Sequence, residues 1–202
     1  MSDVRRLVLA SQSPARLQLM RQAGLDPEVV VSGVDESTVQ APRVAELVAL
    51  LAAAKAAAVA GRETDALVVA ADSLLEFRGQ AMGKPADVAE ARLRWERMRG
   101  RSGVLHTGQA VLDVRDGSVA QRDVGVSSTV VHFAEPTPEE IEAYLATGEP
   151  LAVAGAFTLD GLGAQFVRRV EGDPSAVVGL SLPLLRTQLA RLGTSLTDLW
   201  RH

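Results

Sequence analysis

The chain has 202 residues, of which 47% are hydrophobic and 23% charged, with a formal net charge of −4. This composition is typical of a globular protein with a substantial core, and it argues against an intrinsically disordered chain. The acidic balance argues against a nucleic-acid-binding surface, and the absence of cysteine excludes disulfides and thiolate metal sites. No signal pattern or membrane-spanning segment is predicted, so we expect a cytoplasmic protein with one domain over residues 1–202.

The first half of the chain alternates short apolar runs with longer helical segments, which is typical of a parallel α/β unit. Strands are predicted at 7–10, 28–31 and 66–71, and helices at 14–23 and 42–60. Pro14 and Pro42 suit first helical positions because their fixed φ is already helical. The run 66–71 is apolar throughout, which indicates a strand buried on both faces. It delivers Asp72 at its carboxyl end, where open α/β sheets place ligands.

The second half is predicted to be mainly antiparallel. Turn residues separate two pairs of strand-like runs, 74–77 from 81–82 and 104–114 from 118–133. Capping patterns predict helices beginning near Asp87 and Thr137 and ending at about 98 and 148, and a further helix is expected at 183–192. Two more strands are predicted at 157–159 and 164–170. The expected fold class is α/β, with a mixed sheet, helices on both faces and one cleft between two lobes.

The turn after the first strand carries Ser11, Ser13 and Arg16. Ser13 is the expected N-cap of the following helix. Exposed N–H groups, hydroxyls and the positive end of a helix together suit a phosphate, and Arg16 adds a fork of charged donors. The simpler interpretation is an ordinary capped junction with a surface arginine, since a serine cap before proline is common.

Four further charged residues could serve the same ligand, and each also has a purely structural interpretation. Asp72 either caps the turn after its strand or works in a cleft. Glu36 belongs to a pair of adjacent loop carboxylates, and such pairs are usually only solvated. Lys55 projects from the apolar stripe of its predicted helix, where lysines commonly snorkel to solvent. Lys84 lies in a rigid loop between glycine and proline and could reach a phosphate.

Together these cations and carboxylates fit metal-assisted attack of water on a phosphoryl centre. The cations would neutralise a polyphosphate, while Glu36 and Asp72 would hold a Mg²⁺-like ion and one of them would orient the water. Other chemistries lack their signatures, because neither a GxxxxGK[ST] loop nor a G-x-S-x-G turn is present. The three histidines, His106, His132 and His202, share no metal-ligand spacing, and Gly161-Leu162-Gly163 is too short to indicate a dinucleotide site.

Several stretches, in one order, resemble the successive motifs of a single family. They are Leu9-Ala10-Ser11-Gln12-Ser13-Pro14-Ala15-Arg16, Val34-Asp35-Glu36, Ala71-Asp72-Ser73, Gly83-Lys84-Pro85, His106-Thr107-Gly108, Gly155-Ala156-Phe157, Glu171-Gly172-Asp173 and Val178-Gly179-Leu180-Ser181-Leu182-Pro183. The chain is similar in these stretches to the Maf proteins, nucleoside-triphosphate pyrophosphatases once named for inhibition of septum formation. The resemblance covers nearly the whole chain, from residue 7 to about 192.

The resemblance implies an inosine-triphosphatase-like fold with an elongated mixed sheet and a central cleft. It implies hydrolysis of a nucleoside triphosphate to a monophosphate and pyrophosphate, which would clear non-standard or surplus nucleotides. A divalent cation (Mg²⁺ or Mn²⁺) and a homodimer are also implied, with no nucleic-acid or membrane partner expected. Asp72 matches the proton acceptor, and the cleft positions are matched by Ser11, Arg16, Glu36, Lys55 and Lys84. The alternative is a nucleotide-binding regulator of cell division with incidental turnover, for which the full carboxylate and lysine set would not be required.

Three positions depart from many members of that family. Ala15 stands in place of arginine, Ser73 in place of threonine and Asp160 in place of glutamine. These departures concern the choice of base more than the reaction. An ionised aspartate only accepts hydrogen bonds, so Asp160 suits the adjacent N1 and N2 donors of guanine. Alternatively, Asp160 merely begins a turn with Gly161 and faces solvent.

Overall fold

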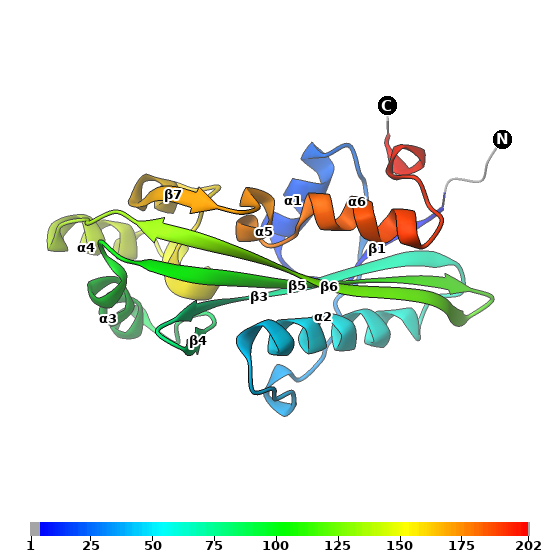
Figure 1. Ribbon diagram of the computed structural model, residues 1–202, viewed down its shortest axis with the longest axis horizontal. Coiled ribbons are helices and arrows are strands. Elements are labelled where there is room, and N and C mark those ends of the chain that lie inside the picture. The colour runs from blue at the N-terminus through cyan, green and yellow to red at the C-terminus, as the bar shows by residue number, and fades with distance from the viewer. Residues whose placement is uncertain (1–4, 202) are drawn as a thin grey trace.

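The computed structural model describes residues 5–201 and has an elongated α/β fold built on one mixed sheet (Figure 1). The strands are β1 (Leu7–Leu9), β2 (Glu28–Val29), β3 (Ala66–Phe77), β4 (Gln80–Met82), β5 (Ser102–Arg115), β6 (Ser118–Phe133) and β7 (Val167–Glu171). The α-helices are α1 (Pro14–Gln22), α2 (Val44–Ala60), α3 (Val88–Met98), α4 (Pro138–Ala146), α5 (Pro174–Val178) and α6 (Leu182–Arg191). The single domain over 1–202 stays a prediction, and residues 1–4 and His202 lie outside the described range.

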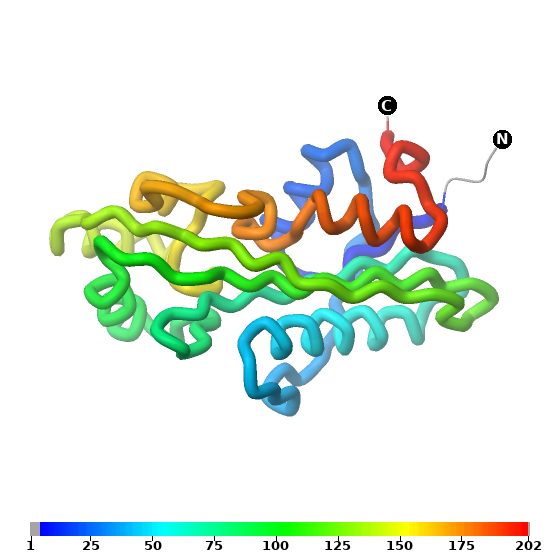
Figure 2. Tube along the Cα trace, viewed as in Figure 1, coloured from blue at the N-terminus to red at the C-terminus, as the bar shows by residue number. Residues whose placement is uncertain are grey.

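The strand order is β2-β1-β3-β5-β6-β7, with β4 paired to β3. The strands of the first half, β2, β1 and β3, run parallel, as their alternation with helices predicts. The long strands β3, β5 and β6 run antiparallel and form a spine along the length of the molecule (Figure 2). This arrangement confirms the predicted mixed sheet.

Helices cover both faces of the sheet at the end that holds β1 (Figure 1). The layer under α2 is filled by small side chains such as Ala52, Ala56 and Ala70, whereas leucines dominate the layer under α1 and α6. At the other end, α3 and α4 surround an aromatic cluster in which Trp95 packs edge-on against Phe133 at 5.7 Å between ring centroids. The described core therefore has three clusters, two on opposite faces of the sheet at one end and one at the other end.

Helix α2 lies unusually close to the sheet at Gly108 on β5. A Cβ atom at this position would be 2.1 Å from the carbonyl oxygen of Val48, so only glycine fits between the helix and the strand. Gly108 pairs with Asp72 of β3. The close contact therefore holds α2 against the sheet at the level of Asp72.

The predicted helix caps are confirmed. The Ser13 side chain caps α1, and Asp87 Oδ1 accepts from the Glu90 amide at 2.8 Å to cap α3. At α4 the capping box is complete, because Thr137 and Glu140 each accept a hydrogen bond from the other's backbone amide. Local side-chain chemistry thus determines where these helices begin.

The prediction that Asp72 ends a strand is wrong. β3 continues for five residues beyond it, because β5 pairs with β3 continuously from Ala66 to Glu76. A neighbouring strand supplies hydrogen bonds whether or not the side chains are apolar, so the polar residues do not end the strand. Asp72 therefore lies in mid-strand and caps no turn.

Other boundaries differ from the predicted ones. Residues 157–159 do not form a strand; instead Phe157 turns its ring into the aromatic cluster, 5.1 Å from Phe133. The strand predicted at 164–170 begins only at Val167, after a short 3-10 helix. Smaller shifts occur elsewhere: β2 ends at Val29, α2 begins at Val44 and α6 begins at Leu182.

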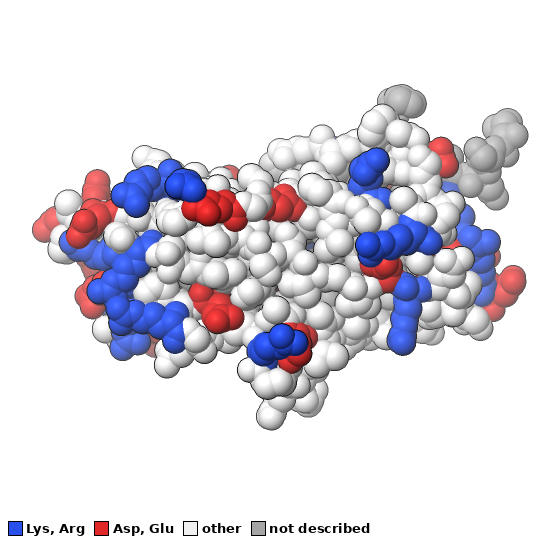
Figure 3. Space-filling view, viewed as in Figure 1, with Lys and Arg blue, Asp and Glu red and all other residues white. Residues whose placement is uncertain are grey.

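Charged side chains of both signs are interspersed on the face shown in Figure 3, and the cations lie mainly toward the two ends. Between residues 5 and 201, none of the helices has the length and apolar character needed to cross a bilayer.

Candidate active site

A cleft opens along one edge of β3, in a gap between its two neighbouring strands. β1 pairs with β3 up to Leu9 opposite Val69, and β4 begins pairing at Leu75. In the described part of the chain, no strand pairs with the part of this edge that lies between those points. A cavity of about 650 Å³ opens there, which is large enough for a nucleotide-sized ligand.

All nine residues that the sequence singles out line this one cavity. They are Ser11, Ser13, Arg16, Glu36, Lys55, Asp72, Ser73, Lys84 and Asp160. They come from segments far apart in the chain, namely the β1–α1 turn, the loop before α2, α2 itself, β3, the loop before α3 and a loop before β7. The fold therefore brings these nine residues together, although they come from separate segments of the chain.

Lys55 forms ion pairs with two carboxylates of the cleft. The Lys55 Nζ atom lies 2.5 Å from Asp72 Oδ1 and 2.6 Å from Glu36 Oε1. The side chains of Lys55 and Asp72 are 11% and 9% exposed, whereas that of Glu36 is 56% exposed. Lys55 therefore does not snorkel to solvent but compensates a buried negative charge.

The environment of Asp72 favours proton binding more than an ordinary aspartate does. Burial raises the pKa of Asp72, and the negative charge of Glu36 raises it further, while Lys55 and Arg16 act in the opposite direction. The net pKa lies above the usual value for aspartate. A carboxylate with a raised pKa is a better proton acceptor at neutral pH.

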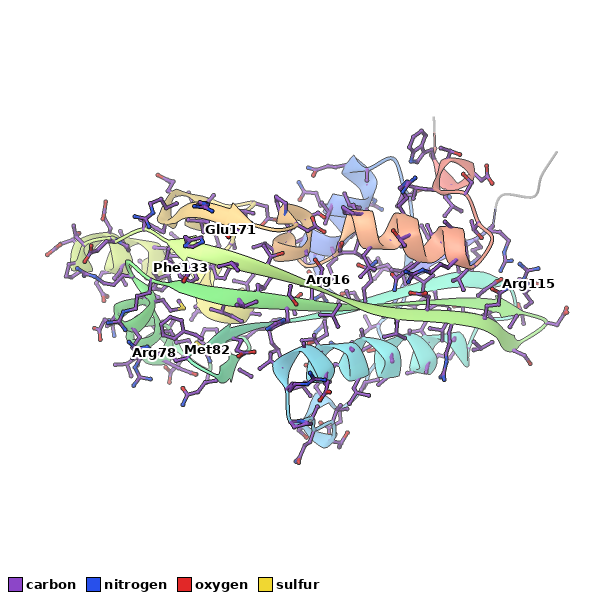
Figure 4. The ribbon with its side chains drawn as sticks, in the orientation of Figure 1. Arg16, Arg78, Met82, Arg115, Phe133 and Glu171 are labelled. Atoms are coloured by element: carbon purple, nitrogen blue, oxygen red, sulfur yellow. The ribbon has the colours of Figure 1, made fainter. Side chains whose placement is uncertain are left out.

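Arg16, which Figure 4 labels near the middle of the long axis of the molecule, is held by contacts from three parts of the chain. Its Nε donates to the carbonyl oxygen of Gly179 at 2.7 Å, and its terminal nitrogens donate to Ser11 Oγ at 3.2 Å and Ser73 Oγ at 3.3 Å. Burial lowers the pKa of Arg16, against the effect of Asp72 and Glu36, but a guanidinium keeps its charge in proteins. This fixed cation stands at the first turn of α1.

The β1–α1 turn itself is arranged by its two serines. Ser11 Oγ accepts from the Ser13 amide at 3.1 Å, and Ser13 Oγ accepts from the Arg16 amide at 3.5 Å. The structural interpretation as a capped junction is therefore correct, and the same turn also lines the cavity. The N-terminus of α1 presents its positive dipole end to the cleft.

Lys84 and Asp160 are exposed side chains on the cavity lining. Within residues 5–201, neither forms an ion pair, so both charges are available to a ligand. Asp160 lies in a bend before Gly161 as well as on the cavity lining, so its two interpretations, a base contact and a turn residue, both stay predictions.

Two uncharged residues that hold the site together are not singled out individually by the sequence analysis. Thr107 Oγ1 lies 2.9 Å from Ser73 Oγ, and Gly179 supplies the carbonyl that holds Arg16. Gly179 has φ of +130°, and a Cβ atom there would lie 3.1 Å from Arg16 Nε. Both residues fall in stretches that resemble Maf motifs, but their roles depend on contacts with residues distant in sequence.

The carboxylates fit a hard divalent cation only in part. Within the described residues, no group of three or more Asp, Glu, His or Cys side chains is arranged to hold a metal ion. Glu36 and Asp72 each contact Lys55 through one oxygen. Since Mg²⁺ is usually held by one or two carboxylates together with substrate phosphates, this pair fits such an ion when a polyphosphate supplies the remaining ligands.

The chain matches the family model described as Maf-like protein over residues 6–192. It is 59% identical over 198 residues to a nucleoside triphosphate pyrophosphatase of Streptomyces coelicolor, covering 97% of this chain and 95% of that protein. Relatives of the same name from Salinispora tropica and Rhodococcus erythropolis are 58% and 54% identical, over 96% of this chain and 87% and 96% of theirs. The extent of these matches, which include every residue placed on the cavity, shows that the chain belongs to the family of Maf-like proteins.

Proposed function

We propose that this protein hydrolyses nucleoside triphosphates to nucleoside monophosphates and pyrophosphate in the cleft beside β3. The observation that carries the proposal is the buried Lys55–Asp72 pair on the same cavity as Arg16 and Lys84. The name shared by its relatives, nucleoside triphosphate pyrophosphatase, supports the same activity.

In this proposal the polyphosphate binds near the N-terminus of α1. Arg16 and Lys84 neutralise its charge from separate segments, and Ser11, Ser13 and Ser73 provide hydroxyls that line the same cavity. Because the contacts to Ser11, Ser73 and Gly179 already orient Arg16, little side-chain ordering is needed on binding.

Asp72 is proposed to accept a proton from the attacking water. Lys55 keeps the carboxylate oriented, and it also offsets the negative charge that accumulates when a polyphosphate enters. Glu36 and Asp72 would hold a divalent cation (Mg²⁺ or Mn²⁺), which when bound would polarise the phosphoryl oxygens.

Binding without turnover accounts less well for this arrangement. A protein that only bound nucleotides, such as a regulator of cell division, would not need the proton acceptor that Asp72 is proposed to be. A buried carboxylate opposes the binding of an anion nearby, so its presence favours a chemical role. A cytoplasmic location and a homodimer stay predictions of the sequence and of the family resemblance.

A panel of nucleoside triphosphates tests the activity and its metal requirement. We expect pyrophosphate release with Mg²⁺ or Mn²⁺ and none in the presence of a chelator, with recovery when the metal is restored. Release that is undiminished by chelation would contradict the role proposed for Glu36 and Asp72 in metal binding.

Asp160 is proposed to contact the nucleobase. As an acceptor only, it suits the two adjacent donors of guanine or 7-methylguanine, whereas glutamine can serve the mixed edge of uracil or thymine. We therefore expect Asp160→Gln to shift kcat/KM from GTP and 7-methyl-GTP toward UTP and dTTP by about tenfold, the size of one hydrogen bond to a charged group. An unchanged ranking of the four substrates would assign Asp160 to the turn alone.

A further inference from the structure

The loop of residues 158–163, which carries Asp160, contributes to the lining of the cleft. Thr158 and Asp160 line the cavity, and the loop ends in the 3-10 helix Leu162–Phe166 before β7. The loop contains no α-helix or β-strand that would fix its backbone. Its shape must therefore come from contacts with other segments.

A single carboxylate makes most of these contacts. Glu149, in the 3-10 helix Glu149–Ala152 after α4, accepts hydrogen bonds from both ends of the loop. Its Oε1 accepts from Thr158 Oγ1 at 2.5 Å and from the Gly163 amide at 2.9 Å. The same oxygen accepts from the Tyr144 hydroxyl at 2.9 Å, and Oε2 accepts from the Leu162 amide at 3.0 Å.

The two glycines of the loop make this close approach possible. A Cβ atom on Gly161 would lie 2.6 Å from Glu149 Oε2, and one on Gly163 would lie 2.3 Å from the Tyr144 hydroxyl. A side chain at Gly161 would collide with the carboxylate, and one at Gly163 would collide with Tyr144 and Thr158, which both donate to it. The Gly161-Leu162-Gly163 stretch, which does not indicate a dinucleotide site, is therefore explained by its close contacts with Glu149, Tyr144 and Thr158.

The protonation state of Glu149 matches its four donors. Burial raises the pKa of Glu149, but the hydrogen bonds from Thr158, Gly163, Leu162 and Tyr144 outweigh burial and lower it below the ordinary value. The side chain is therefore an ionised carboxylate at neutral pH and accepts from all four groups. An amide in its place would present its own N–H groups to one or more of these donors.

We propose that Glu149 is a positioning residue for base discrimination. Its hydrogen bonds fix the 158–163 loop, so that Asp160 contacts the nucleobase from a single position. This inference rests on the proposed function, because it assumes that a nucleotide occupies the cleft. Asp160 stands between two points of the loop, Thr158 and Leu162, that are both bound to Glu149. A polar group discriminates between bases only when its position is fixed before binding. Weakening the hydrogen bonds to Glu149 should therefore lower the selectivity between bases more than it lowers the affinity for the polyphosphate.

The test measures binding with nucleotides that cannot be cleaved between the α- and β-phosphates. Dissociation constants for α,β-methylene GTP, α,β-methylene UTP and tripolyphosphate are determined with Mg²⁺ for the wild type and Glu149→Gln. We expect the preference of the wild type for one base over the other to fall about fivefold in the variant, because a hydrogen bond to a charged group is weakened. The affinity for tripolyphosphate, which has no base, should stay within about twofold, since Arg16 and Lys84 are untouched.

Glu140→Gln serves as the matched control, because Glu140 also accepts a backbone hydrogen bond at α4 but does not line the cavity. It should leave the base preference unchanged. Tyr144→Phe removes one donor to Glu149 and keeps the packed ring, so it should lower the preference in the same direction by a smaller factor. If Glu149→Gln does not fold, the same measurements on Tyr144→Phe test the proposal.

Equal losses of affinity for all three ligands in the loop variants would overturn the inference, because they would indicate general damage to the cleft. A wild type that binds both nucleotides equally, or a base preference that survives in Glu149→Gln and Tyr144→Phe, would also overturn it. These outcomes do not depend on turnover. A wild type that shows the binding contrast but releases no pyrophosphate from any nucleotide would refute the proposed function alone.

Discussion

Replacement of Asp72 by asparagine is expected to lower kcat by roughly two to four orders of magnitude, the range typical for the loss of a general acid or base. The amide keeps the shape of the side chain but can neither take up the proton nor hold a cation as a carboxylate does. The fold should persist, because Glu36 still compensates Lys55 at 2.6 Å and because β5 pairs with β3 on both sides of the position. Steady-state pyrophosphate release, together with the thermal unfolding curve, measures both effects.

Asp113→Asn is the matched control for Asp72→Asn. Asp113 is also a buried aspartate of the same sheet in an ion pair, with Arg5 at 2.5 Å, but it lies outside the cleft. Its replacement should lower stability and leave kcat within a few-fold. Near-normal turnover in Asp72→Asn would instead move the catalytic role to Glu36.

Lys55→Met should lower the free energy of unfolding by about 3 kcal/mol at neutral pH and abolish measurable turnover. Methionine replaces the buried aliphatic stem, but it leaves Asp72 as a buried carboxylate without its nearest cation. The folded-state pKa of Asp72 then rises further above its unfolded value, so the lost stability should be regained as the pH falls through that folded pKa. Urea unfolding at several pH values measures the change.

A double variant separates the loss of charge compensation from simple damage to packing. If the cost in Lys55→Met comes from the uncompensated charge, adding Asp72→Asn should restore part of the lost stability, because the unpaired carboxylate is then removed. Destabilisation that is additive in the double variant, or independent of pH in Lys55→Met, would contradict this account.

The composition of the site could be predicted from the sequence, but its internal geometry could not. Ser13 and Pro14 locate the β1–α1 junction through local cap chemistry, and Lys84 lies in a short rigid loop. The pairing of Lys55 with Asp72 joins residues of a helix and a strand across the α2–β3 layer. No local pattern encodes that contact, because it depends on how closely α2 packs on the sheet.

The wrong predictions share a physical cause, which is that long-range contacts override local patterns. Asp72 resembles a strand end because an apolar run stops there, yet pairing with β5 continues the strand. Phe157 resembles a strand residue, yet its place in the aromatic cluster bends the chain away from the sheet. Glu149 shows no signal in the sequence, since its donors lie up to 14 residues away and two of them are backbone amides.

Phosphorus NMR of the reaction products tests the central claim most directly. The wild-type protein is incubated with GTP and Mg²⁺, and Asp72→Asn is followed in parallel under the same conditions. The account predicts that GMP and pyrophosphate appear together in equal amounts with the wild type and are not detected with the variant over the same period. GDP and free phosphate as the products, or the same products at the same rate from Asp72→Asn, would contradict it.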